Sequence, residues 1–107
     1  MSNDIQNHVK YIVNKIEQGF SDDELNCDDE PMTAFDYLQD ALDIEYIVNG
    51  KREVLGARIL VTFGGPNIWI NTRTKQVEGY WWGDKCIMSY DQDNIGLDDA
   101  IATLWEC

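Results

Sequence analysis

The chain has 107 residues, 44% of them hydrophobic and 11% aromatic, and its 20 acidic and 8 basic residues give a formal net charge of -12. This length and composition are typical of a single folded domain, residues 1–107, and argue against a disordered chain. The negative field argues against direct binding to nucleic acid or to an anionic membrane, whereas it attracts basic surfaces.

The negative charge is concentrated in the first half of the chain. Residues 1–50 hold 12 acidic and 2 basic residues (net -10), whereas residues 51–107 hold 8 and 6 (net -2). Cys27, Cys86 and Cys107 are odd in number and widely spaced, which is no pattern for a secreted disulfide scaffold. No apolar run has the length of a signal segment or a membrane span. We therefore expect a cytoplasmic protein with reduced thiols.

Two helices are predicted in the acidic half. Apolar residues at three- and four-residue spacing predict an amphipathic helix over residues 4–19, which Gly19 can end. Residues 21–30, SDDELNCDDE, predict an exposed acidic loop or a short extra turn. A second helix is expected over residues 33–42, with Thr33 and Asp36 as a capping box. Its buried stripe would be formed by Phe35, Leu38 and Leu42.

The rest of the sequence, from residue 43 onward, predicts a sheet followed by a C-terminal helix. Alternating residues predict strands over 43–48, 53–63, 68–72 and 77–82, with Asn49-Gly50 in a two-residue type I′ turn. Residues 86–88 are either a fifth strand or an extended return. The spacing of Leu97, Ile101 and Leu104 predicts a C-terminal helix. The predicted fold is α+β: an antiparallel meander of four or five strands, with two N-terminal helices and one C-terminal helix packed on it.

Residue types give little support for catalysis. His8 is the only histidine, and the first helix places it next to the apolar stripe without a serine or cysteine to activate. The acids of residues 22–30 lack the glycine and the spacing of a calcium loop, and Gly64-Gly65 does not match a phosphate-binding loop. We predict no catalytic residue, no metal and no cofactor. A small hydrolase or metal-dependent enzyme is the least favoured alternative.

Aromatic residues are dense on the predicted strands. Trp81 and Trp82 are adjacent, so in a regular strand they point to opposite faces. One face must then be covered by another element, such as the C-terminal helix, or form an aromatic patch that anchors a partner.

Three segments carry a resemblance: DYLQDALDIEYIV from Asp36, GARILVTFGGPNIWINT from Gly56 and VEGYWWGD from Val77. This central half of the chain resembles short acidic proteins encoded by bacterial phages and mobile elements. The resemblance implies a bacterial or phage-infected host cell. It also implies an inhibitor of host defence, of the anti-restriction or anti-CRISPR type that mimics DNA. It implies no catalytic residues.

The leading hypothesis is a non-enzymatic inhibitor whose acids imitate a row of phosphates and occupy the basic, nucleic-acid-binding surface of a nuclease or CRISPR-type complex. The predicted partner-binding residues are Glu17, Asp22, Asp23, Glu24, Asp28, Asp29 and Glu30, with Trp69 and Trp82 as apolar anchors. An alternative is a small interaction or immunity-type module that binds a protein through the aromatic sheet face. A further one is an acidic protein whose charge only keeps it soluble and monomeric.

Overall fold

The computed structural model describes residues 2–106, with side chains from residue 4 onward, and consists of three helices and five strands. The elements are α1 (Ser2–Gln18), α2 (Ala34–Gln39), β1 (Asp43–Val48), β2 (Val54–Thr62), β3 (Asn67–Asn71), β4 (Gln76–Trp81), β5 (Asp84–Ser89) and α3 (Leu97–Glu106).

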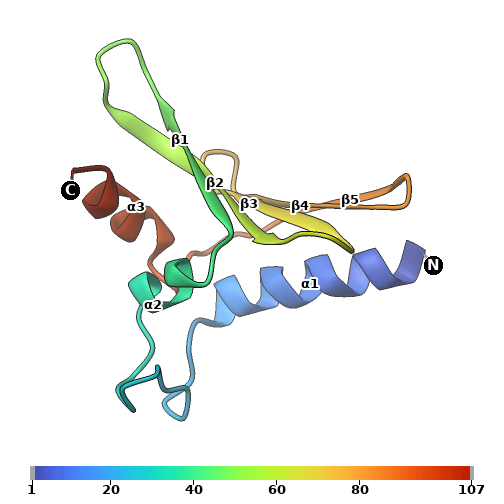
Figure 1. Cartoon of the computed structure of the whole chain (residues 1–107), viewed down its shortest axis with the longest axis horizontal. Coiled ribbons are helices and arrows are strands. Elements are labelled where there is room, and N and C mark those ends of the chain that lie inside the picture. Colours follow the sequence, from blue (N-terminus) through green and yellow to red (C-terminus); the bar gives the residue numbers. More distant parts are fainter. Residues whose placement is uncertain (1, 107) are drawn as a thin grey trace.

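The five strands form one antiparallel sheet in the order β1-β2-β3-β4-β5. This confirms the predicted α+β meander and establishes β5 as a fifth strand. The helices lie on one side of the sheet (Figure 1), with α1 below β4 and β5 and with α3 below β2. The other face of the sheet carries no helix in the part of the chain that the structure describes.

Packing of α1 on the sheet forms the largest part of the core. The predicted apolar stripe is confirmed, because it is buried against the sheet; its buried members are Ile5, Val9, Ile12, Val13 and Ile16. Gly79 on β4 allows the close approach, since a Cβ there would lie 2.5 Å from Val9 Cγ2 and 2.8 Å from Ile5 Cδ1. Gly19 ends α1 with a positive φ of 75°, as predicted.

The C-terminal helix α3 completes the core on the same face. Leu97, Ala100 and Ile101 are buried in one cluster with the residues of α1 and the sheet. The Asp93 carboxylate starts the helix, because its oxygens accept hydrogen bonds from the backbone N–H groups of Gly96 (2.9 Å) and Asp98 (3.0 Å). The predicted C-terminal helix is therefore confirmed, but it does not cover the second face of the sheet.

The second helix is shorter than the predicted 33–42. The Thr33–Asp36 capping box is present, but α2 ends at Gln39 because the chain then joins the sheet, where the Leu42 N–H donates to the Leu60 carbonyl at 2.8 Å. Of the predicted buried stripe only Leu38 is buried. Phe35 and Leu42 are 42% and 60% exposed, and that part of the prediction is wrong.

The prediction of a two-residue type I′ turn at Asn49-Gly50 is also wrong. The loop spans residues 49–53, and the positive φ, 64°, belongs to Arg52. The Asn49 side chain accepts hydrogen bonds from the N–H groups of Lys51 (2.9 Å) and Glu53 (3.0 Å), which stabilises the longer loop. The turn with two positive φ values lies instead at Trp82-Gly83, between β4 and β5.

The contact between Gly79 and α1 gives a first prediction. Gly79→Ala forces a methyl group against Val9 and Ile5, so we expect it to lower the free energy of unfolding by about 1–3 kcal/mol. Urea denaturation followed by circular dichroism measures this loss. Gly50→Ala is the matched control, because a Cβ at Gly50 meets nothing within 4 Å. Equal stability of the two variants would contradict the close packing of α1 on β4.

Candidate functional site

The predicted acidic loop is a folded hairpin, which we call the acidic hairpin (residues 21–32). Leu25 and Pro31 form an antiparallel bridge, flanked by hydrogen bonds from Asn26 N–H to the Glu30 carbonyl (2.8 Å) and from Met32 N–H to the Glu24 carbonyl (3.1 Å). The chain reverses near Asp29, which has a positive φ of 59°. The hairpin projects beyond the ends of α1 and α2, away from the sheet (Figure 1).

The Asn26 side chain holds the tip of the hairpin together. Its Oδ1 accepts hydrogen bonds from the N–H groups of Asp28 (2.8 Å) and Glu30 (3.0 Å), and its Nδ2 donates to Asp36 Oδ2 at 3.2 Å. Asp36 belongs to the capping box of α2, so Asn26 links the hairpin to that helix. Hydrogen bonds from the Thr33 N–H, from Asn26 and from the Thr33 hydroxyl lower the pKa of Asp36.

A second contact links the hairpin to α1. Glu24 forms an ion pair with Lys15 and accepts a hydrogen bond from the Ser21 N–H at 3.1 Å. The bond from Lys15 is the main cause of the lowered pKa of Glu24, and the Ser21 N–H adds to it. Glu17 likewise has an internal partner, because it accepts a hydrogen bond from the Asp91 N–H at 2.9 Å. These two predicted partner-binding residues therefore help to hold the fold.

The remaining acids of the predicted set are presented to solvent along the hairpin. The exposed members are Asp22, Asp23, Asp28, Asp29 and Glu30. Within residues 2–106 the ion pairs join Glu24 to Lys15, and Glu45 and Glu78 to Arg58. The exposed hairpin acids are therefore not neutralised by a lysine or arginine of the described chain.

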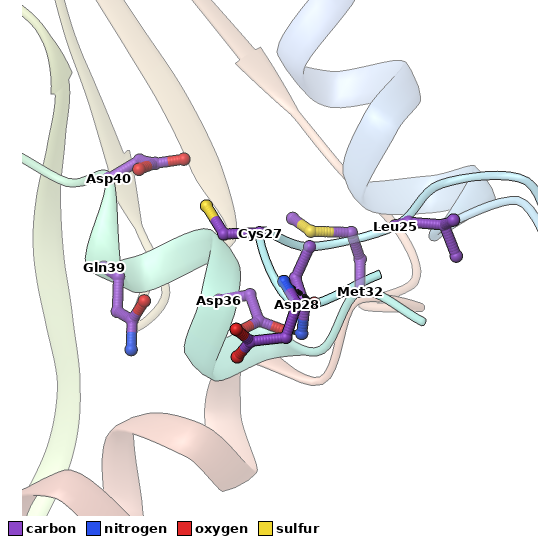
Figure 2. Close-up of a pocket in the computed structure, with 8 residues that line it drawn as sticks. Leu25, Cys27, Asp28, Met32, Asp36, Gln39 and Asp40 are labelled. Atoms are coloured by element: carbon purple, nitrogen blue, oxygen red, sulfur yellow. Dashed lines mark hydrogen bonds between the residues drawn. The ribbon is translucent and has the colours of Figure 1, made fainter. Parts of the chain in front are cut away.

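A hollow of about 440 Å³ separates the acidic hairpin from α2. Asp28 from the hairpin and Asp36 from α2 both line it, and Figure 2 shows Asp40 at the far end of α2. Cys27, Met32 and Leu25 supply the apolar part of the lining. Groups of three or more histidine, cysteine or carboxylate side chains that could hold a metal ion are absent from the described residues. The hollow is an acidic, partly apolar recess.

The predicted anchor Trp69 lies on the helix-free face of the sheet, where it is half-buried. The Arg58 guanidinium lies over its ring, 4.3 Å from the ring centroid, and contacts Glu45 (3.3 Å) and Glu78 (3.6 Å). The Tyr80 hydroxyl donates to Glu78 at 3.0 Å. Trp69 therefore belongs to a cluster whose charged groups already have partners.

The predicted anchor Trp82 is not a strand residue, contrary to the expected strand over 77–82. β4 ends at Trp81, which is half-buried with its ring edge-on to His8 at 6.2 Å between centroids. Trp82 and Gly83 form the β4–β5 turn with φ values of 53° and 84°, which is the pattern of a type I′ turn. The side chain of Trp82 is 90% exposed. The argument that Trp81 and Trp82 occupy opposite sheet faces is therefore wrong.

The predicted site residues do not form one surface. The acids of the hairpin lie together, whereas Trp69 is on the helix-free sheet face and Trp82 is in the turn beside the start of α1 (Figure 1). Asn26, Asp36 and Asp40 also belong to the hairpin region, although they were not among the predicted site residues. An Asn inside an acidic run, five residues before Pro31, is the signal that could have indicated a folded hairpin.

The remaining sequence predictions concern His8 and the cysteines. His8 is exposed on α1, and Cys86 is half-buried against the core. Cys27 is exposed in the hairpin, and Cys107 lies outside the described residues.

One carboxylate outside the hairpin has a raised pKa. Burial, and then the charge of Asp93, raise the pKa of Asp98 at the start of α3. Asp98 lines a recess of about 190 Å³ with Gly56, Thr72 and Ile101. None of these three neighbours is a histidine or a cysteine. Asp93 is already used as the cap of α3. Burial and the neighbouring Asp93 therefore account for the raised pKa of Asp98.

The comparisons with known proteins add no relative. No protein-family model matches the chain, and the searches of curated proteins and of solved structures found no match. Within the described residues, no helix is both long and apolar enough to cross a membrane.

The role of Asn26 gives a second prediction. Asn26→Ala removes the acceptor of the Asp28 and Glu30 amides, so we expect both amides to exchange hydrogen about fivefold to tenfold faster. Amide hydrogen exchange measured by NMR detects this change. Asn14→Ala, on the exposed side of α1, is the control and leaves both rates unchanged. Unchanged exchange in Asn26→Ala would contradict the ordered hairpin.

The turn at Trp82 gives a third prediction. A left-handed backbone is costly for most residues but is well accepted by asparagine, so Trp82→Asn should raise the free energy of unfolding by about 1 kcal/mol. Urea denaturation measures the gain. Phe63→Asn is the control, because Phe63 is also exposed (71%) but has no positive φ, and it should give no gain. A loss of stability in Trp82→Asn would show that the indole stabilises the free protein.

Proposed function

We propose that the protein is a non-enzymatic binding protein that occupies a basic, nucleic-acid-binding surface of another protein through its acidic hairpin. The observation that carries the proposal is the folded hairpin itself, which presents exposed carboxylates on a frame fixed by Asn26 and Glu24. A groove that binds nucleic acid is adapted to closely spaced negative charge, and carboxylates on a fixed backbone offer such charge with less loss of backbone freedom on binding.

The distribution of basic residues supports the same surface. Residues 51–107 contain six lysines and arginines, and four of them lie on two turns. Lys51 and Arg52 lie on the first turn, and Arg73 and Lys75 lie on the second. The two turns are at the same end of the sheet, because β2 and β3 pair antiparallel and a Cβ at Gly56 would lie 2.9 Å from Arg73 Cβ. The hairpin lies away from this end (Figure 1). The negative field at the hairpin is therefore little compensated, which favours association with a basic partner and makes it dependent on salt.

The recess between the hairpin and α2 extends this acidic surface. Asp28, Asp36 and Asp40 line it, and Leu25 and Met32 supply an apolar part of the lining. A basic side chain of a partner can place its aliphatic stem on the apolar lining and its charge near the carboxylates. The resemblance to acidic proteins of phages and mobile elements makes a host nuclease or a CRISPR-type complex the class of partner that we propose.

A second candidate function rests on the helix-free face of the sheet. This face carries Trp69, Leu60 and Ile87 in one cross-strand row with Glu78. A protein-interaction or immunity-type module could use it as a flat binding surface. We place it second, because Arg58 covers the Trp69 ring and the charged groups of the cluster are already paired with one another.

Charge reversal in the hairpin gives the fourth prediction. The test variant changes three exposed hairpin acids without internal partners to lysine: Asp22, Asp23 and Asp28. The tagged protein is used to capture proteins from bacterial lysate at low salt, and captured proteins are identified by mass spectrometry. We expect a nucleic-acid-binding protein that is released by salt and by competing duplex DNA, and at least a tenfold lower yield with the variant, because each lost charge pair weakens the contact.

The matched control carries the same change of charge elsewhere. It reverses three exposed acids outside the hairpin: Asp91, Asp99 and Glu106. The control should retain the captured protein, which separates a local role of the hairpin from a simple effect of net charge. Equal loss of capture in both triple variants would show that capture depends on the net charge of the whole protein and not on the hairpin. Loss only in Trp69→Ala, with capture that resists salt, would establish the sheet-face alternative instead.

A further inference from the structure

Two indoles and two carboxylates line a second, smaller hollow at the opposite end of α1 from the hairpin. The lining residues are Asp4, Trp81, Trp82 and Asp84, and the volume is about 120 Å³. Asp4 comes from the first turn of α1, Trp81 from the end of β4 and Asp84 from the start of β5. The hollow is therefore built where α1 meets the β4–β5 turn (Figure 1).

The two indoles are held in place by different means. Trp81 is half-buried and packs against the core and edge-on to His8. Trp82 is held by the turn, whose positive φ values at Trp82 and Gly83 bring its side chain next to Trp81 rather than to the opposite sheet face. Two consecutive tryptophans thereby line the same hollow, which a regular strand would not allow.

The position of Trp82 is difficult to explain by the stability of the free protein. An indole that is 90% exposed contributes little to burial, and a φ of 53° is unfavourable for a tryptophan. Strained backbone of this kind is concentrated at functional sites, where the surrounding structure maintains it. The adjacent Gly83 already supplies one residue suited to the turn, so an asparagine would complete it with less strain.

The lining combines the two groups that recognise an organic cation. Aromatic faces attract a cation through their quadrupole, and they accept the methylene groups around it. The carboxylates of Asp4 and Asp84 add opposite charge at the same hollow. Among the described residues, His8 lies against Trp81, and Lys85 lines a neighbouring hollow that shares Trp81, Trp82 and Asp84 with this one. Two carboxylates with two indoles therefore give the site a preference for positive charge.

We propose that this hollow binds the alkylammonium group of a lysine side chain of a protein partner. The ammonium head lies between the indoles and the two carboxylates, and the aliphatic stem crosses the exposed ring of Trp82. The site is separate from the acidic hairpin, so it provides a second contact for a basic protein at the far end of α1. Its binding of a lysine side chain does not depend on the proposed role of the hairpin.

The test uses the whole protein labelled with ¹⁵N and the small compound N-acetyl-lysine-N-methylamide. The indole N–H signals of Trp81 and Trp82 are followed by NMR during titration, with the indoles of Trp69 and Trp105 as internal references. We expect saturable shifts confined to Trp81 and Trp82. The neutral norleucine analogue, which has a similar stem without the amine, should give no such shifts. Equal shifts with both compounds, or shifts with neither, would overturn the proposal.

Single substitutions test whether the hollow is the site that binds the lysine compound. Trp82→Asn should weaken binding of the lysine compound by about threefold to fivefold or more, in line with the strength of exposed cation–π contacts, although the turn itself becomes more stable. Asp84→Asn should weaken it to a similar extent. Phe63→Asn, another exposed aromatic that does not line the hollow, should bind like the unmodified protein. Unchanged binding in Trp82→Asn would refute the site, whereas the lysate capture with hairpin variants tests the proposed function separately.

Discussion

The close packing of α1 against β4 at Gly79 is the contact on which the arrangement of the molecule depends. The missing side chain at Gly79 lets Ile5 and Val9 lie directly on the sheet, and the rest of the apolar stripe follows along β4 and β5. With α3 on the same face, the core is completed on one side of the sheet. The hairpin after α1 and the turn beside its N-terminus are therefore placed at opposite ends of one helix.

This arrangement separates the two surfaces that we connect with binding. The acidic hairpin is joined to α2 by Asn26 and to α1 by Glu24, so the backbone that carries its exposed carboxylates is held by contacts within the chain. The tryptophan hollow is fixed by the type I′ turn and by the packing of Trp81. We propose that both surfaces bind positively charged groups, so that a basic protein contacts them at two points along α1. Internal partners for Glu17 and Glu24 show that acidity alone does not identify a binding residue.

Much of the fold could be predicted from the sequence, because strong periodicity has a direct structural cause. The three- and four-residue spacing of α1 and the alternation in the strands correspond to the burial of one face. The wrong turn predictions concern residues whose local hydrogen bonds or turn geometry compete with the conformation that the residue type favours. Asn49 makes side-chain bonds that favour a longer loop over the two-residue turn, and Trp82 occupies a turn position that its residue type disfavours. The order of the hairpin depends on Asn26, whose bonds to Asp28, Glu30 and Asp36 no periodicity indicates.

The most direct measurement of the central claim is competition for the captured partner. A labelled DNA duplex is bound to that partner, and its fluorescence anisotropy is followed as the acidic protein is added. If the hairpin occupies the nucleic-acid-binding surface, the duplex is displaced stoichiometrically, and displacement weakens as salt is raised. A ternary complex, in which the duplex and the acidic protein bind the partner at the same time, would contradict the account.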